Sequence, residues 1–151
     1  MLLADTAQVK SDVPPCFSSI SWNAVWSGTP PNTLGILCNP KHALFKHFPT
    51  EEHSNWQWFD LVRNSKPTYE FKPLVQIIPD WNNNRKIGLI FEAKVDKGKL
   101  MVTSIAFDRI MAHSPVARQM YYSLVNYLNS PDFSPEVTLT NEMIDKIFIQ
   151  P

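Results

Sequence analysis

The stretch KIGLIFEAKVDKGKLMVTSIAF, residues 86–107, decides the fold of this chain. It contains two strand-like apolar runs, Lys86–Val95 and Lys99–Phe107, which are separated by Asp96-Lys97-Gly98. This spacing closes a β-hairpin, and Gly98 is expected at a position that needs a positive φ. The stretch therefore predicts two antiparallel strands at one side of a mixed sheet.

Two helices are predicted after the hairpin. Ser114 is a suitable N-cap and Pro115 suits the first turn, and apolar residues then recur at helical spacing. They are Val116, Met120, Tyr121, Leu124, Val125 and Leu128. A short C-terminal helix, residues 140–149, is expected with Thr140 as its cap and Met143, Ile144, Ile147 and Phe148 facing inward.

Two shorter apolar runs precede the hairpin. Leu34–Cys38 is stopped by Asn39-Pro40, and Leu74–Ile78 is closed by Pro79, which is the pattern of buried strands. A short helix is expected over His42–Phe48. Strands interleaved with helices favour an α/β layered architecture, here with flanking helices around the sheet.

A further helix is predicted from Ser54 to about Asn64. Ser54 and Gln57 match a capping box, in which the two side chains satisfy each other's backbone amides. Trp56, Phe59 and Val62 share one helical face at i, i+3, i+6 spacing, and this face is expected to pack on the sheet.

Length and composition fit one globular domain. The chain has 151 residues, of which 44% are hydrophobic and 19% charged, and its formal net charge is zero. We divide it into a loop-rich part, residues 1–33, an α/β core, residues 34–129, and the C-terminal helix. A zero net charge gives no electrostatic attraction to nucleic acid or anionic membrane.

No export signal or membrane span is apparent from the sequence. No run approaches the roughly 20 apolar residues that cross a bilayer, and the start, Met1–Asp5, is too short for a signal-peptide core. A signal would sit at the N-terminus of any longer parent polypeptide, so the localisation stays open.

Candidate nucleophiles and metal ligands are weak. Cys16 and Cys38 could form one disulfide, but two thiols in a chain of this length are more often separate buried residues. Cys38 lacks the second glycine of a nucleophile elbow. The four histidines show no metal-ligand spacing, and no glycine-rich phosphate loop exists, so we expect neither metal nor cofactor. These histidines are His42, His47, His53 and His113.

Three carboxylates lie at or beside predicted strand ends: Asp80, Glu92 and Asp108. Two of them about 5–10 Å apart across a cleft would suit glycoside hydrolysis. Glu92 is the most interesting, because strand alternation places it on the face of Ile90, where an acid is unexpected. A solvated outer face, or an ion pair with Arg85 or Arg118, explains it more simply.

Five tryptophans are many for this length, and sugars commonly bind on aromatic rings flanked by amide and acid groups. Core filling is the more frequent use of tryptophan, which we expect for most of the five. The best candidates for exposure and carbohydrate contact are Trp58, which lies one position off the inward face, and Trp81 beside Asp80.

Several long motifs carry a resemblance to a known family. TLGILCNPKH, residues 33–42, and FPTEEHSNWQW, residues 48–58, look like the C-terminal region of large glycoside hydrolase family 2 proteins of gut Bacteroides, which are β-galactosidase-like or sugar-binding. VQIIPD at residues 75–80, Lys86–Lys99 and PVARQ at residues 115–119 continue the resemblance in the same order. It covers the chain from about Ser19 to Pro135.

The resemblance implies a fold and a role. That region is similar to a class I glutamine-amidotransferase-like domain, a three-layer, flavodoxin-like α/β fold, whose hairpin carries Gly-Lys-Gly-Lys where this chain has Asp96–Lys99. The first half of such a domain, including a nucleophile elbow, is expected to be absent here. Family 2 catalytic carboxylates lie in a barrel domain outside this chain, so no catalytic residue is carried over.

The expectation for function is thus a non-catalytic accessory module of a carbohydrate-active enzyme. Its partners would be carbohydrate or neighbouring domains, with a homo-oligomer also open and a periplasmic or secreted location if the parent is of this type. Candidate contact residues are His53, Trp58, Asp80, Trp81 and Glu92. The alternatives are a free-standing carbohydrate-binding module and a small glycoside hydrolase with an acid pair.

Overall fold

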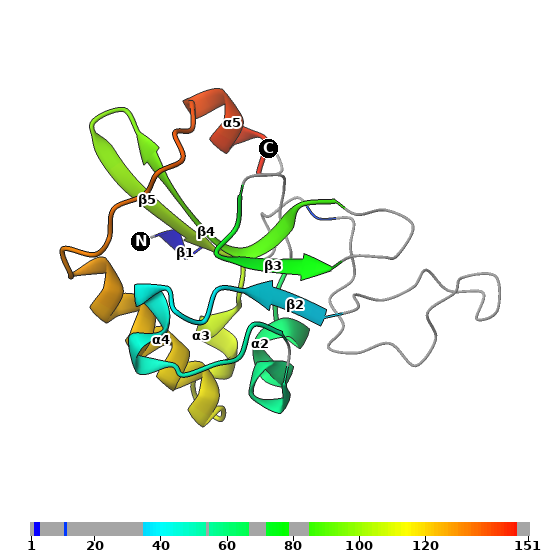
Figure 1. Ribbon diagram of the computed structural model, residues 1–151. Helices are drawn as coiled ribbons and strands as arrows, with labels where there is room; N and C mark the ends of the chain where they lie inside the picture. The colour runs from blue at the N-terminus through cyan, green and yellow to red at the C-terminus, as the bar shows by residue number, and fades with distance from the viewer. Residues whose placement is uncertain are drawn as a thin grey trace, which may run out of the picture.

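The computed structural model describes residues 2–3, 11, 35–53, 55–66, 72–78 and 85–147. Its strands are β1 (Leu2–Leu3), β2 (Gly35–Cys38), β3 (Val75–Ile78), β4 (Ile87–Val95) and β5 (Gly98–Thr103). The helices are η1 (Ala43–His47), η2 (Trp56–Trp58), α2 (Phe59–Arg63), α3 (Phe107–Ile110), α4 (Pro115–Leu128) and α5 (Asn141–Asp145). Figure 1 shows these elements around one sheet.

The strands form one mixed sheet in the order β1-β5-β4-β3-β2. β1 runs parallel to β5, and every other neighbouring pair is antiparallel. The predicted α/β class with a mixed sheet is confirmed. The hairpin β4–β5 lies inside the sheet and not at its side, because β1 pairs with the outer edge of β5.

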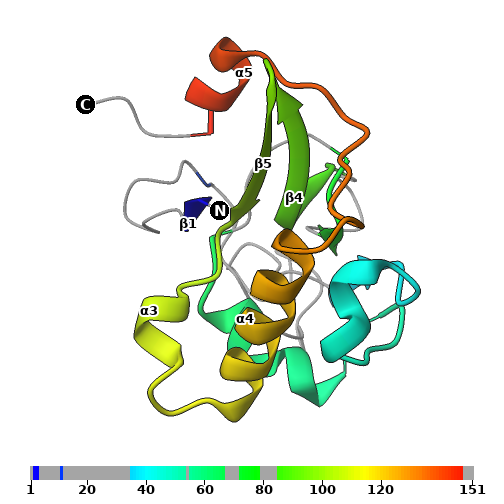
Figure 2. The ribbon, with the colours of Figure 1, turned by 90° about the vertical axis from the view of Figure 1, so that its left-hand side faces the viewer.

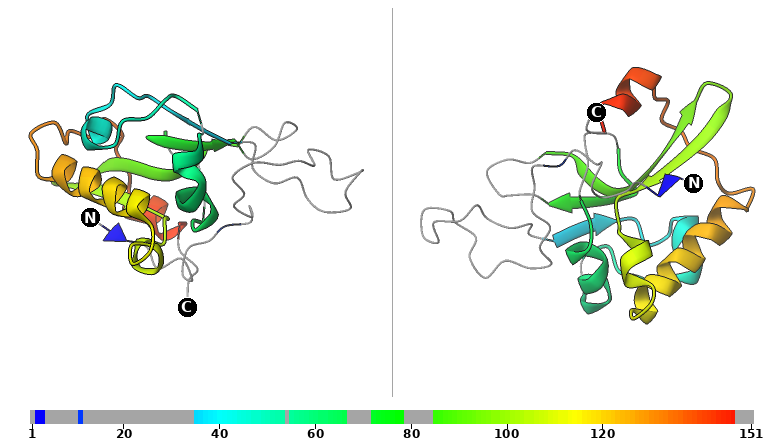
Figure 3. Two further views of the ribbon diagram at one scale, coloured as in Figure 1. Left: turned by 90° about the horizontal axis from the view of Figure 1, so that it is seen from below. Right: turned by 180° about the vertical axis from the view of Figure 1, so that it is seen from behind.

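Helices cover most of one face of the sheet. In Figure 1, α2, α3 and α4 lie below the strands, and Figure 2 shows α3 and η1 on either side of α4. The two views of Figure 3 agree with this arrangement. The main core lies between these helices and the sheet and includes Leu44, Ile77, Ile90, Met120 and Leu124.

A second, smaller core covers the other side of the hairpin. There Phe91, Ala93 and Val102 pack with Leu139 and Ile147. α5 lies over this side, opposite the other helices (Figure 1). As predicted, Thr140 caps α5 by accepting a hydrogen bond from Met143 N at 3.3 Å.

The predicted cap of α4 is confirmed. Ser114 Oγ accepts a hydrogen bond from Ala117 N and donates one to Asp60 Oδ2 at 2.7 Å, which ties α4 to α2. The buried face of α4 is centred on Met120 and Leu124 as expected, and it also includes Ala117, Ser123 and Tyr127.

Two details of the hairpin prediction are wrong. The positive φ belongs to Asp96, at 50°, and Gly98 begins β5 without one. β5 also ends at Thr103, short of Phe107. Ser104 N still donates to Leu89 O and Ile105 bridges to Ser65, after which Phe107 begins α3, a short helix missed in the sequence.

Other predictions fall on residues that the structure does not describe. They include most of the loop-rich part and the environments of Cys16, Trp22 and Trp26. The last helix was predicted to reach residue 149, but α5 ends at Asp145 and a turn follows at residues 146–147. In the described part of the chain, no helix combines the length and apolar character needed to cross a bilayer.

Candidate functional site

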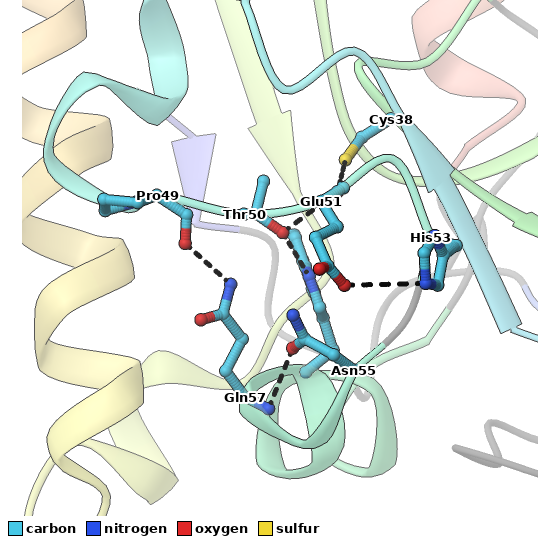
Figure 4. Close-up of polar contacts among 8 residues, drawn as sticks. Cys38, Pro49, Thr50, Glu51, His53, Asn55 and Gln57 are labelled. Atoms are coloured by element: carbon cyan, nitrogen blue, oxygen red, sulfur yellow. Dashed lines mark hydrogen bonds and ion pairs between the residues drawn. The ribbon is translucent and has the colours of Figure 1, made fainter.

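The segment 49–58 is a hydrogen-bonded structural unit (Figure 4). Asn55 Oδ1 accepts from Gln57 N at 3.1 Å, so Asn55 is the N-cap of η2. Gln57 Nε2 donates to Pro49 O at 2.9 Å. The Gln57 side chain therefore holds the preceding loop, which differs from the predicted capping box. Ser54 lies outside the described residues.

The two tryptophans of this segment exchange their predicted roles. Trp58, expected at the surface, is 0% exposed, and its Nε1 donates to Thr50 Oγ1 at 2.9 Å. Trp56, expected in the core, is 79% exposed and contacts Phe59. The cause is the 3-10 turn at the start of the helix, because three residues per turn shift the inward face relative to an α-helix.

His53 is exposed, as expected. Its Nε2 lies 3.5 Å from Glu51 Oε2, and the two side chains are each 62% exposed. The backbone of His53 forms an isolated antiparallel bridge with Leu37, so residues 51–53 cover the edge of β2. An ion pair this exposed contributes little to stability.

Glu92 lies on the face of β4 that α4 covers. Tyr127 Oη donates to Glu92 Oε2 at 2.8 Å, whereas Arg118, one proposed ion-pair partner, donates to Met111 O at 2.6 Å. Glu92 Oε1 has no hydrogen-bond partner among the described residues. One carboxylate oxygen is therefore fixed and the other is available.

Tyr127 is held by two aromatic rings. The rings of His42 and Phe133 contact it edge-on, with centroid distances of 5.3 and 5.5 Å. His42 Nδ1 accepts from Leu44 N at 3.2 Å, so the neutral imidazole carries its proton on Nε2. Burial, and then the hydrogen bond to Glu92, raises the pKa of Tyr127. The phenol stays protonated and remains a donor to Glu92.

β4 changes its neighbour at Glu92. Leu74 N donates to Ile90 O at 2.8 Å on the side of β3, whereas Lys94 N donates to Val137 O at 2.7 Å farther along the same edge. We call the edge between these two contacts the notch. A strand directs the N–H and C=O groups of alternate residues to the same edge, so those of Glu92 face the notch.

A pocket of about 650 Å³ opens at the notch. It is lined by strand ends of the sheet, by Tyr127 and by the chain that follows α4. The lining residues are Leu37, Cys38, Asn39, His42, Lys72, Pro73, Leu74, Gln76, Lys86, Glu92, Tyr127, Asp132, Ser134, Glu136 and Val137. This volume is within the usual range of small-molecule sites, about 300–1,000 Å³.

Cys38 lines the pocket but is not an activated nucleophile. Its thiol is free, and Sγ donates to Glu51 O at 3.2 Å. Burial, with a smaller effect of Glu52, raises the pKa of Cys38 to about 11. Because the thiolate is the reactive form, Cys38 is essentially unreactive at neutral pH.

The predicted contact residues thus fall into two places. Glu92 lines the pocket, whereas His53 and Trp58 belong to the segment around Thr50. Asp80 and Trp81 lie outside the described residues. Asp108, the other acid considered, is exposed in α3 and does not line the pocket.

Tyr127 is the main residue missed by the sequence reading. It continues the i, i+4, i+7 series of Met120 and Leu124, so its inward position was available from the helical pattern. Its partner Glu92 stood out in the sequence, because an acid is unexpected on the face of Ile90. Within the described part of the chain, no group of three or more His, Cys, Asp or Glu side chains could hold a metal ion.

The raised pKa of Tyr127 predicts an alkaline weakness. The unfolded chain releases this proton near pH 10, whereas the folded chain retains it. The unfolded state then binds fewer protons, so the Tyr127 contribution to the free energy of unfolding falls as the pH rises above about 10. Urea unfolding between about pH 9 and 11 should show a shallower decline for Tyr127→Phe than for wild type.

Tyr122→Phe is the matched control, because Tyr122 lies on α4 like Tyr127 but is 53% exposed, with its ring against His47 of η1. This variant should show the same decline in the free energy of unfolding with pH as wild type. Equal declines for Tyr127→Phe and wild type would contradict the buried Tyr127–Glu92 contact.

The architecture and the notch define the chain as a mixed α/β protein with a pocket of mixed polar and apolar lining at a sheet edge. A family model, "Domain of unknown function (DUF8487)", matches residues 1–149, and the chain belongs to this family. No curated protein gives a significant match to the chain.

Proposed function

We propose that this chain is a non-catalytic accessory module of a glycoside hydrolase, where it packs on neighbouring domains or contacts glycan. The proposal includes the finer fold, a truncated glutamine-amidotransferase-like domain, and a parent enzyme of the family 2, β-galactosidase-like type. It rests on the motifs at residues 33–42, 48–58, 75–80, 86–99 and 115–119, which follow the order of that family.

The observation that carries the proposal is the structural use of the motif at residues 48–58. In residues 48–58, Trp58 fills the core, Gln57 holds Pro49, and Asn55 caps the helix. Packing and capping account for these side chains without any role in a reaction. This supports a role in which the segment maintains a surface for a neighbouring domain.

The candidate reactive groups point the same way. The thiol of Cys38 is protonated at neutral pH. Glu92, the strongest candidate acid, has one oxygen committed to Tyr127. An accessory module needs neither an activated nucleophile nor a free acid pair.

A second candidate function is a small glycoside hydrolase with an acid pair. It is favoured by the presence of Asp132 and Glu136 in the lining of the same pocket as Glu92. Such an enzyme would use one carboxyl group as acid and another as base or nucleophile.

A hydrolysis assay separates the two functions. The purified chain is incubated with nitrophenyl glycosides of galactose, glucose and xylose, beside the Glu92→Gln variant. We expect no release of nitrophenol above the buffer rate from either protein. Turnover by the wild type that Glu92→Gln abolishes would overturn the accessory role and establish the hydrolase.

A further inference from the structure

We propose that the pocket at the notch binds the vicinal hydroxyl groups of a neutral sugar, with Glu92 as its central contact. This inference rests on the proposed accessory role in a carbohydrate-active enzyme and names the site through which glycan contact would occur.

The first support is the backbone of Glu92. Its N–H and C=O face the notch, and in the described ranges no hydrogen bond satisfies either group. Buried or half-buried strand groups normally find a partner in protein, water or ligand. A vicinal diol fits this pair, because one hydroxyl oxygen accepts from the N–H while its neighbour donates to the C=O.

The second support is the side chain of the same residue. Tyr127 fixes Glu92 Oε2 at 2.8 Å, which leaves Oε1 as an oriented acceptor beside the open backbone groups. Hydrogen bonds to an ionised carboxylate are shorter and stronger than neutral ones. A hydroxyl group is the simplest ligand donor for this oxygen.

The remaining lining favours a neutral ligand. The carboxylates of Glu92, Asp132 and Glu136 share the pocket with Lys72 and Lys86, so neither sign of charge dominates. A site for phosphate or another polyanion would concentrate basic groups or a helix N-terminus. This mixture of donors and acceptors suits a ligand with hydroxyl groups, because each hydroxyl can both donate and accept a hydrogen bond.

Apolar groups complete the match. Leu37, Pro73, Leu74 and Val137 line the pocket beside the amides of Asn39 and Gln76. The C–H faces of a pyranose ring need apolar contacts of this kind, whereas its hydroxyl edge needs amides and carboxylates. The volume admits a mono- or disaccharide.

Calorimetric titration of the full chain tests the inference. The probes are lactose, cellobiose and xylobiose into the millimolar range, with inorganic phosphate as the charged comparison. We expect at least one sugar to bind and phosphate not to bind. Glu92→Gln, which keeps an acceptor for Tyr127, should lower the affinity for that sugar by about tenfold or more.

Two further variants keep the test decisive. Gln76→Ala should also weaken sugar binding. This second variant keeps the test valid if Glu92→Gln fails to fold. Trp56→Ala, at the exposed aromatic ring outside the pocket, should retain wild-type affinity. Thermal melting checks that each variant is folded.

Loss of binding in Trp56→Ala with full affinity in Glu92→Gln would overturn the site. Absence of binding to all three sugars, or binding of phosphate in their place, would overturn the ligand class. The accessory role fails on a different result, namely turnover in the hydrolysis assay, so the two failures are distinguishable.

Discussion

Trp58→Ala should lower the free energy of unfolding by about 3–5 kcal/mol. Trp58 is 0% exposed, its ring contacts Phe45 and Phe48 edge-on, and its Nε1 donates to Thr50. The substitution removes the whole indole from the core and leaves a cavity that the surrounding loop and helix fill only in part. Domains of this size have about 5–15 kcal/mol of stability, so much of the margin is lost.

Trp56→Ala is the matched control, two residues away on the same turn. Its ring is 79% exposed, and its contact with Phe59 is worth about 0.5–1.5 kcal/mol. Urea unfolding followed by far-ultraviolet circular dichroism compares the two variants without relying on tryptophan fluorescence. Equal costs, or a larger cost for Trp56→Ala, would contradict the exchanged roles of these residues.

Gly88→Ala should also destabilise the protein strongly, by about 1–3 kcal/mol. A Cβ atom on Gly88 would overlap the Cβ of Pro73 and lie 3.1 Å from the carbonyl oxygen of Val75. These atoms belong to the chain entering β3 and to the register shift between Val75 and Gln76, which cannot move without disturbing the β3–β4 pairing. Pro73 and Gln76 also line the pocket, so we expect sugar binding to weaken in this variant.

Gly98→Ala provides the comparison at the other glycine of the hairpin. The nearest atom to an added Cβ is Val95 O at 3.4 Å, an ordinary contact, and Gly98 does not have a positive φ. Its stability should stay within about 0.5 kcal/mol of wild type. Thermal or urea unfolding of both variants checks the contrast. A Gly88→Ala variant as stable as wild type would mean that Pro73 does not pack closely against Gly88 of β4.

Local patterns in the sequence predicted most of the regular elements. The apolar runs identified β2, β3 and the hairpin, and Ser114-Pro115 and Thr140 marked the starts of α4 and α5. These signals succeed because strand alternation, caps and helical spacing depend on neighbours close in the chain. The predicted α/β class followed from their order.

The errors arose where short-range rules compete. Asp96 and Gly98 both tolerate turn conformations. Val95 pairs with Gly98, so the turn consists of Asp96 and Lys97 alone, and the positive φ falls on Asp96. The tryptophans were exchanged because the first turn of the helix is a 3-10 turn, which rotates the buried face. The spacing of apolar residues alone does not distinguish a 3-10 turn from an α-helical turn.

The pocket was beyond local prediction for a different reason. It forms where Glu92, Tyr127 and Val137, which are distant in the sequence, meet at one edge of β4. The sequence indicated only that an acid at Glu92 was unexpected on its face. The notch depends on long-range pairing of β4 first with β3 and then with the chain after α4, and no motif encodes that change of neighbour.

The most direct measurement is an NMR titration of the ¹⁵N-labelled chain with the sugar that binds in calorimetry. Our account predicts saturable shifts of the backbone amides around the notch, above all Glu92, Asn39 and Val137. Shifts that cluster instead at His53 and Trp56, or amides at the notch that stay unchanged at saturating sugar, would contradict it.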